Sequence, residues 1–251
     1  MSDDDGSGLT YRCVLLKISG DALRGELPFG ISKDAIEAVA AECVEVVRLG
    51  VRLAMVVGGG NFVRGAEAAG RTLKRATADY MGMLATMMNA LALQDAIEAL
   101  GQETRVLSAL KSEEVAEPYI RRRALRHLEQ KRIVILAGGT GMPYFTTDTT
   151  AAVRATEMGA EVLLKATKVD GVYDKDPEKH DDARRFEHLL YMDCITDRLR
   201  VMDATAITHC MENKLPVIVF NLRTAGNIRK AVLGERVGTL VDASGQSETA
   251  D

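Results

Sequence analysis

Short apolar runs alternate with longer segments of helical periodicity along this chain. The runs are rich in strand-forming residues and show little polar alternation, which is typical of strands buried on both faces of a sheet. The segments between most of them carry apolar residues at helical spacing. This alternation predicts an α/β fold with a mainly parallel central sheet that helices cover on both faces. The predicted strands are residues 13–18, 51–57, 133–137, 162–164 and 217–220.

For three of the intervening segments the sequence predicts a specific structure. The first helix is expected to follow a Ser32 cap and to run to about Leu49, where Gly50 ends it. Segment 77–100 is rich in Met and Leu among helix-forming residues and predicts one long buried helix, although a subunit interface would show the same pattern. Segment 167–185 is dense in Asp, Lys and Gly and lacks periodicity. It predicts a long exposed loop, and loops of this length are often functional.

Length and composition indicate the size of the fold and exclude some classes of binding partner. With 251 residues, 47% of them hydrophobic, the chain can bury the core of one domain. That domain is expected at residues 11–241, with polar, flexible tails at 1–10 and 242–251. The net charge of -4 and the pI of about 5.7 argue against nucleic acid or an anionic membrane as the main partner.

Cysteine and histidine usage gives no sign of a metal site or a disulfide framework. The cysteines are widely spaced and form no CxxC pair, which fits a reducing, cytoplasmic environment. No apolar run approaches the roughly 18 residues of a membrane span, so neither secretion nor membrane insertion is expected. The histidines have no ligand spacing and are interpreted as structural. These residues are Cys13, Cys43, Cys194 and Cys210, and His127, His180, His188 and His209.

Three predicted strands run directly into loops that contain glycine, at residues 19–20, 58–60 and 138–141. The carboxyl ends of parallel strands meet at one edge of a sheet, so these loops can share a single ligand crevice. The third loop continues as GGTGMPYFTTD, residues 138–148, into a predicted helix. Unpaired backbone N–H groups and the helix dipole favour an anion there, and a phosphate ester is the natural ligand. The sequence therefore predicts a protein that handles phosphate, most simply an enzyme.

Several side chains around these loops could contact such a ligand. Lys17 closes the first predicted strand and could reach phosphoryl oxygens, although a lysine in this position is more often a solvated charge. Arg64 follows the triple glycine. Three consecutive glycines cost conformational entropy that a plain turn need not spend, so this segment favours phosphate contact over a flexible turn with a surface arginine. Asp148 would be a helix cap in the alternative interpretation of its loop, but Tyr144 and Phe145 are poorly explained in a plain linker and favour a ligand site. Segment 165–176 offers two lysines, a hydroxyl and a tyrosine, but by itself it does not distinguish a nucleotide site from a charged turn.

The best-known phosphate and hydrolase motifs are absent from the sequence. It contains no GxxxxGK[ST] loop, no GxGxxG after a strand, no HExxH and no nucleophile elbow. The familiar nucleotide-binding folds that carry these motifs are therefore not indicated.

Taken together, six segments resemble the bacterial uridylate kinase branch of the amino acid kinase family. They are LLKISGDAL, VVGGGNFVRG, ADYMGMLATMMNALAL, GGTGMPYFTTD, KATKVDGVYDKDP and KLPVIVFN, and the resemblance extends over residues 11–241. The order of DYMGMLAT and GMPYFTTD is specific to the uridylate branch. The resemblance implies a three-layer α/β/α sandwich, a cytoplasmic homohexamer, and ATP with Mg²⁺ as co-reactants. It also implies transfer of the ATP γ-phosphoryl group to UMP, giving UDP and ADP in pyrimidine biosynthesis, with GTP as activator and UTP as inhibitor.

The same resemblance implies roles for individual residues. Lys17 would bridge the donor and acceptor phosphates, while Asp148 and Asp203 would orient it and support the metal. Mg²⁺ would bridge ATP oxygens rather than occupy a protein cage. The implied catalytic residues are Lys17, Arg64, Asp148 and Asp203. The implied ATP contacts are Lys17, Ile18, Ser19, Gly20, Gly60, Arg64, Thr167, Tyr173 and Asp176. The implied UMP contacts are Gly59, Asp79 at the ribose, Thr140, Gly141, Met142, Pro143, Tyr144, Phe145, Thr146 and Thr147, and the implied effector loop is Gly25, Glu26, Leu27, Pro28, Phe29 and Gly30.

Two other functions remain as alternatives. One is a kinase of the same fold that phosphorylates a carboxylate, a carbamate or isopentenyl phosphate, and the DYMGMLAT and GMPYFTTD segments speak against it. The other is a nucleotide- or oxyanion-binding storage or sensing protein that has lost turnover. The presence of Lys17, Arg64, Asp148 and Asp203 argues for retained catalysis.

Overall fold

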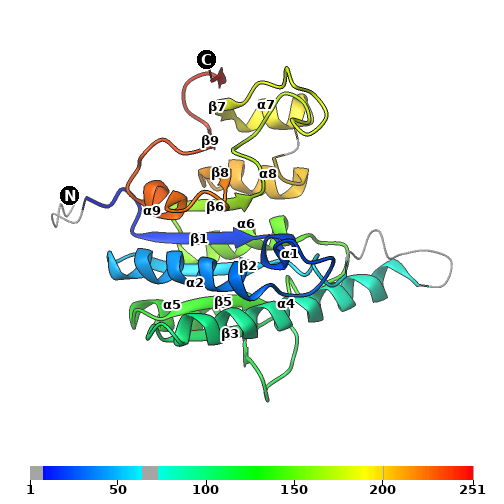
Figure 1. Ribbon diagram of the computed structural model, residues 1–251, viewed down its shortest axis with the longest axis vertical. Coiled ribbons are helices and arrows are strands. Elements are labelled where there is room, and N and C mark those ends of the chain that lie inside the picture. The colour runs from blue at the N-terminus through cyan, green and yellow to red at the C-terminus, as the bar shows by residue number, and fades with distance from the viewer. Residues whose placement is uncertain (1–7, 64–72, 200, 251) are drawn as a thin grey trace.

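One sheet organises the chain. The computed structural model describes residues 8–63, 73–199 and 201–250, and ten strands within them lie in the order β10-β7-β9-β8-β6-β1-β2-β5-β3-β4 (Figure 1). Neighbouring strands run parallel except at the β8–β9 and β10–β7 pairs. The strands are β1 (Cys13–Ile18), β2 (Arg52–Val57), β3 (Thr104–Ser108), β4 (Glu117–Pro118), β5 (Ile133–Ala137), β6 (Val162–Thr167), β7 (Phe186–Leu190), β8 (Val217–Asn221), β9 (Thr239–Asp242) and β10 (Glu248–Thr249).

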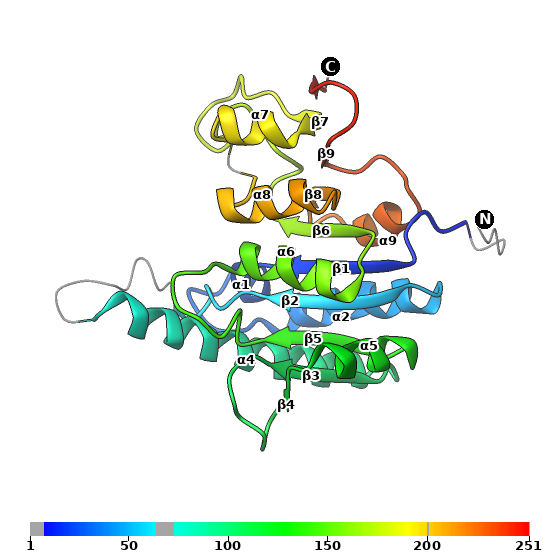
Figure 2. The ribbon, with the colours of Figure 1, turned by 180° about the vertical axis from the view of Figure 1, so that it is seen from behind.

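Helices cover both faces of this sheet. Those in front of it in Figure 1 are α1 (Gly20–Arg24), α2 (Lys33–Arg48), α4 (Arg75–Glu98) and α9 (Asn227–Val232). Those on the opposite face, seen in Figure 2, are α5 (Arg121–Glu129), α6 (Thr147–Met158) and α8 (Ala204–Glu212), with α7 (Tyr191–Thr196) beside α8 and β7. The predicted three-layer α/β/α sandwich is confirmed.

Strand β1 shows why its sequence is apolar without alternation. Val14, Leu16 and Ile18 pack into the core on the α2 and α4 side, while Leu15 packs into the core on the α6 and α8 side. Both faces of the strand are therefore buried, as expected for a central parallel strand. Lys17 lies on the same face as Leu15 because successive side chains of a strand point to opposite faces.

The order in which strands are added reverses at β1. The chain first adds β2, β3 and β4 on one side of β1, inserts β5 between β2 and β3, and then adds β6 on the other side of β1. In open parallel sheets the ligand crevice lies at such a switch point, outside the carboxyl ends of the strands. Lys17 of β1 pairs in register with Lys165 of β6, so both lysines lie at this position.

The elements around the crevice agree with the sequence pattern. The five predicted strands appear within a few residues of their expected bounds, and Ser32 caps α2 by accepting a hydrogen bond from the Ala35 backbone N–H. Segment 167–185 carries no helix or strand between the end of β6 and the start of β7, apart from an isolated bridge between Tyr173 and Arg185. The prediction of a long loop is confirmed.

Helix α4 differs from the prediction of a wholly buried helix. One side of it packs against the sheet, but the other side exposes Tyr80, Met81, Leu84 and Met88. Apolar residues occur all around this helix, so the sequence pattern alone could not indicate which side faces the sheet.

The C-terminal segment also differs from the expected flexible tail. Residues 248–249 form β10, which pairs with β7, and the Ser247 hydroxyl accepts a hydrogen bond from the Leu190 backbone N–H. Backbone pairing with an edge strand needs little apolar sequence, which is why composition did not reveal it. Of the expected N-terminal tail, residues 1–7 lie outside the described residues. Among the helices that the structure describes, none has the length and hydropathy that a membrane span needs.

Candidate active site

Two lysines, Lys17 buried and Lys165 largely buried, share one carboxylate at the switch point. The Nζ atom of Lys17 lies 2.9 Å from Asp148 Oδ1, and that of Lys165 lies 2.7 Å from Asp148 Oδ2. Lys165 also donates to the Val201 carbonyl. Lys17 and Lys165 come from neighbouring strands, and Asp148 comes from the first turn of α6. With both lysines protonated, the cluster carries one unmatched positive charge beside the ends of β1 and β6.

The electrostatics of this cluster follow from burial and charge together. Burial alone would raise the pKa of Asp148, but the charges of Lys17 and Lys165 outweigh it and lower the pKa from 3.8 to about 2. Burial, together with the charge of Lys17, lowers the pKa of Lys165, and Asp148 opposes that change. Asp148 is therefore ionised at neutral pH and holds both lysine side chains in place.

Thr146 and Asp203 fix the start of helix α6. Thr146 is the N-cap, because its hydroxyl accepts from the backbone N–H groups of Asp148 and Thr149 at 3.1 and 3.2 Å. The alternative that Asp148 caps this helix is therefore wrong, and its carboxylate is left to bind the lysines. Asp203 caps α8 by accepting from the Ala206 N–H at 3.0 Å, and it also accepts from the hydroxyls of Thr146 and Thr149. Asp203 thus links α8 to α6, which carries Asp148.

Two glycines allow the loops to approach one another. A Cβ on Gly20 would lie 2.5 Å from Asn61 Oδ1 and 2.6 Å from the Gly60 nitrogen. A Cβ on Gly59 would lie 2.5 Å from the Gly82 carbonyl oxygen of α4. No other residue fits at either position without moving backbone. The loops after β1 and β2 therefore pack against each other and against α4, as the shared-crevice prediction requires.

A cavity of about 260 Å³ opens between α4, the loop after β2 and the loop after β5. Its wall contains seven of the predicted nucleotide contacts together with further residues of α4, of α6 and of the two loops. The seven are Gly59, Gly60, Asp79, Thr140, Phe145, Thr146 and Thr147, and the others are Val63, Arg75, Gly82, Met83, Thr86, Gly139 and Thr150. This cavity and the lysine cluster meet at the start of α6.

The middle of the 138–148 loop lies outside the wall of this cavity. Gly141, Met142, Pro143 and Tyr144 do not line this cavity. The Tyr144 N–H donates to Asp79 Oδ2 at 2.9 Å, and its ring lies under the Arg75 guanidinium at 5.7 Å. The loop is thus attached to α4 through Asp79.

The predicted ATP contacts lie around the ends of β1 and β6. Ser19 caps α1 by accepting from the Ala22 N–H, and the Thr167 hydroxyl donates to the Val169 carbonyl at 2.8 Å. Thr167 lines a separate hollow of about 200 Å³ beside α1 and α2. Within the loop that follows, Asp176 pairs with Lys179 at 3.0 Å. Ile18, Thr167, Tyr173 and Asp176 do not line the 260 Å³ cavity, so their contact with ATP stays a prediction, and Arg64 lies outside the described residues.

Lys165 was predicted only as one lysine of the charged segment 165–176, without a catalytic role. It closes the apolar run of β6 much as Lys17 closes that of β1. The sequence does show two lysines at equivalent positions of two apolar strands, which could have indicated a shared role. The strand register that makes them neighbours is known only from the sheet. Arg75, which binds the Asp79 carboxylate at 2.8 Å, was also missed.

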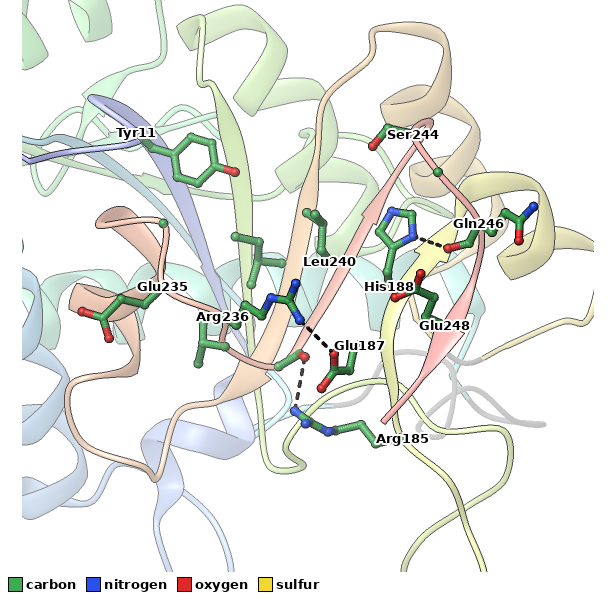
Figure 3. A pocket seen from close by; sticks show the side chains of 15 residues that line it. Tyr11, Arg185, Glu187, His188, Glu235, Arg236, Leu240, Ser244, Gln246 and Glu248 are labelled. Carbon is green, nitrogen blue, oxygen red and sulfur yellow. Dashed lines mark hydrogen bonds and ion pairs between the residues drawn. The ribbon is translucent and has the colours of Figure 1, made fainter. Parts of the chain in front are cut away.

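A larger cavity of about 450 Å³ lies beside β7, β9 and β10. Figure 3 shows that its wall mixes acidic and basic groups, with Arg236 directed toward Glu187 and His188 beside Gln246. None of the predicted site residues lines it. Arg236 pairs with Glu187, Arg185 donates to the Gly238 carbonyl and His188 bonds to the Gln246 carbonyl, so these groups are directed to different partners and do not form a charge cluster like that of the two lysines.

His188 in that wall holds the C-terminal segment in a pH-dependent way. Its Nδ1 and Nε2 atoms face two acceptors, the Gln246 carbonyl at 2.7 Å and the Asp242 carboxylate at 2.9 Å, so both bonds form only when the ring is protonated. Burial lowers the pKa of His188, but the hydrogen bonds to Asp242 and Gln246 and the charges of Asp242 and Glu248 together outweigh it, and the pKa is raised above 6.5.

A histidine whose pKa is raised on folding stabilises the fold below its unfolded pKa, and the effect is lost as pH rises through the folded value. We therefore expect His188→Gln to lower the free energy of unfolding by about 1 kcal/mol at pH 6 and by much less at pH 9. Urea titrations of both proteins at the two pH values measure this. A loss of equal size at both values would contradict it.

Comparisons with known proteins agree with this geometry. The family model of the amino acid kinase family matches residues 12–221. The crystal structure of a UMP kinase from Bacillus anthracis matches with 37% sequence identity and a TM-score of 0.92, over 96% of this chain and 99% of that one. A UMP kinase from Ureaplasma parvum matches with 35% identity and a TM-score of 0.86, over 92% and 98% of the two chains. The resemblance that the sequence motifs indicated is confirmed: the chain belongs to the amino acid kinase family.

Proposed function

We propose that this protein is a UMP kinase, which transfers the γ-phosphoryl group of ATP to UMP and releases UDP and ADP. The observation that carries the proposal is the Lys17–Asp148–Lys165 cluster beside a cavity lined by glycines, threonines and Asp79. The similarity to two UMP kinase structures over nearly the whole chain supports this acceptor. The presence of Lys17, Asp148 and Lys165 together beside this cavity favours a catalyst over a binding protein without turnover.

The proposed chemistry is alignment and charge stabilisation. Donor and acceptor phosphates repel each other, so an enzyme gains most by holding them in line and neutralising the charge that develops on the transferred group. Lys17 would contact the transferred group, and Asp148 would orient Lys17 and Lys165 toward it. No protein group needs to form a covalent intermediate.

Mg²⁺ is proposed to enter with ATP. The carboxylates at the start of α6 and α8 are already engaged by protein groups: Asp148 forms ion pairs with both lysines, and Asp203 accepts from threonine hydroxyls and the Ala206 N–H. Within the described residues, no group of three acidic, histidine or cysteine side chains could hold a metal. This donor set fits an ion bound mainly by phosphate oxygens, where it would neutralise charge on ATP.

The direct test is an ADP-release assay. The purified protein is given ATP and Mg²⁺ with UMP, CMP or AMP, or with carboxylate and carbamate acceptors, and each reaction is run with and without GTP. We expect UMP to be turned over fastest. A preference for an acyl acceptor would support the rival kinase, and UMP affinity measured by calorimetry without ADP release would support the binding protein.

Asp79 gives a more specific prediction about UMP. Its carboxylate lines the cavity and binds Arg75 Nε and the Tyr144 N–H. In Asp79→Ala the ribose loses an acceptor and the 138–148 loop loses its attachment to α4. We expect the KM for UMP to rise about 10- to 100-fold, while the KM for ATP changes little. Glu37→Ala, which removes an exposed carboxylate of α2, is the control, and an unchanged KM for UMP in Asp79→Ala would exclude Asp79 from acceptor binding.

Assembly, location and regulation are also proposed by analogy. The exposed apolar side of α4, formed by Tyr80, Met81, Leu84 and Met88, supports self-association, and we propose a cytoplasmic homohexamer. GTP is proposed to activate through residues 25–30 and UTP to inhibit. Light scattering after size-exclusion chromatography tests the assembly, and adding each nucleotide to the ADP-release assay tests the regulation.

A further inference from the structure

Two asparagines form a buried amide pair behind the phosphate loops. Asn89 of α4 is fully buried and Asn61, in the loop after β2, is 3% exposed. The Asn89 Nδ2 donates to Asn61 Oδ1, and the Asn61 Nδ2 donates to Asn89 Oδ1, at 2.7 and 2.9 Å. Each Nδ2 has a second bond, from Asn89 to the Gly58 carbonyl at 2.7 Å and from Asn61 to the Gly30 carbonyl at 2.8 Å. Every N–H of the two amides is therefore used.

This pairing fixes the orientation of both side chains. If either amide were turned over, its oxygen would face a backbone carbonyl oxygen, and two acceptors would meet without a proton between them. Buried amides are tolerated only when they are fully hydrogen-bonded, so the pair has a single satisfied arrangement. An apolar pair would fill the same space, but it could not hold two carbonyl groups in fixed directions.

The held carbonyls belong to loops that form the site. Gly58 precedes Gly59 and Gly60, which line the 260 Å³ cavity. The peptide bond is planar and trans, so directing the Gly58 carbonyl at Asn89 turns the Gly59 N–H to the opposite side, away from Asn89. Gly30 is held twice, because its own N–H also donates to the Asn61 carbonyl at 2.9 Å.

Helix α4 anchors the other wall of the cavity as well. One turn before Asn89, the Thr86 hydroxyl accepts from the Gly138 N–H at 2.8 Å, at the start of the loop after β5. Asp79, near the start of α4, accepts from the Tyr144 N–H of that loop. One rigid helix thus sets the position of both loops, and the amide pair is its connection to the glycine loop after β2.

We propose that Asn61 and Asn89 are positioning residues for UMP, which set the direction of the Gly58–Gly59 peptide and lock it to the 25–30 segment. The proposal rests on the proposed function of the cavity. Neither side chain lines that cavity, so both act through the glycine backbone. The two residues should behave as one unit, because each amide leaves the other unsatisfied when it is removed.

The test compares Asn61→Ser, Asn89→Leu and the double variant with wild type in the ADP-release assay. The control is Leu93→Ala, a fully buried residue of the same helix one turn further on, away from the loops. We expect each amide variant to raise the KM for UMP about tenfold while the KM for ATP changes less than about twofold. The double variant should lose no more than the worse single variant. Leu93→Ala should lower the melting temperature and leave both KM values unchanged.

A second readout does not depend on turnover. Amide hydrogen exchange followed by mass spectrometry should show faster exchange of residues 25–31 and 57–63 together in each amide variant, and not in Leu93→Ala. If the amide variants melt at lower temperature but keep wild-type KM values and exchange, the pair is only structural and the proposal is overturned. If Asn89→Leu does not fold, Asn61→Ser decides alone. A wild-type protein without UMP turnover would defeat the proposed function, whereas the exchange experiment would still decide whether the pair holds the two loops.

Discussion

Replacing Lys17 with alanine is expected to lower kcat by about 10²- to 10³-fold and to leave the protein folded. Lys17 is the buried ammonium of β1 and lies 2.9 Å from Asp148. Removing one aimed donor at a developing negative charge typically costs a factor of this size. The fold should survive because Asp148 keeps its ion pair with Lys165. Steady-state kinetics with ATP and UMP measure the effect, and circular dichroism checks the fold.

The matched control for this experiment is Lys33→Ala. The Lys33 side chain is 83% exposed and pairs with Glu37 at 3.8 Å, so its loss should leave kcat unchanged. Near-normal turnover in Lys17→Ala would remove Lys17 from the mechanism. A comparable loss in Lys33→Ala would show that the assay responds to net charge rather than to the site.

Replacing Asp148 with asparagine is expected to cost both activity and stability. The variant would leave two largely buried lysines side by side without their shared carboxylate, and breaking a buried ion pair in this way costs about 3–5 kcal/mol. Turnover should also fall, because neither lysine would be held toward the substrates. Urea unfolding measures the stability and the ADP-release assay measures the turnover.

A second substitution separates the two effects. Asp148→Asn combined with Lys165→Met removes the repulsion between the lysines and should recover part of the lost stability without recovering turnover. If Asp148→Asn unfolds with the wild-type free energy, the cluster is not the coupled unit described above.

The contribution of Asp148 to stability should also be visible in the acid unfolding of the wild-type protein. The pKa of Asp148 is about 2 in the folded protein, lowered from the ordinary value of 3.8 that applies to the unfolded chain. A carboxylate with a lowered folded pKa stabilises the fold fully above its unfolded pKa, and this stability is lost as pH falls through the folded value. The contribution of Asp148 should therefore disappear between about pH 4 and pH 2.

Local sequence was sufficient for most elements that form the site. Strands β1, β2 and β5, which end at Ile18, Val57 and Ala137, have apolar runs long enough to be recognised, and Ser32 has the side chain of a helix cap. Strands β3 and β7 were missed because their apolar residues are interrupted by Arg105 and by the polar pair Glu187 and His188. Their place in the sheet depends on neighbours that are distant in the chain.

The candidate site was predicted in part. Glycine loops at strand ends indicated a phosphate crevice, and the structure brings three of them to one edge of the sheet. The part of the 138–148 loop expected around UMP is divided, because Phe145, Thr146 and Thr147 line the cavity whereas Tyr144 stacks on Arg75. A loop's backbone path decides which of its side chains face the ligand, and composition does not contain that path.

Local patterns and motifs were enough to establish the α/β class, the central strands, the family resemblance and Lys17 as a candidate. Folding in three dimensions places Lys165 beside Lys17 in register, brings Asp148 to both lysines and pairs Asn61 with Asn89. These facts depend on strand register and on how helices pack across the sheet. Such contacts join residues far apart in the chain, and no local window of sequence contains both partners.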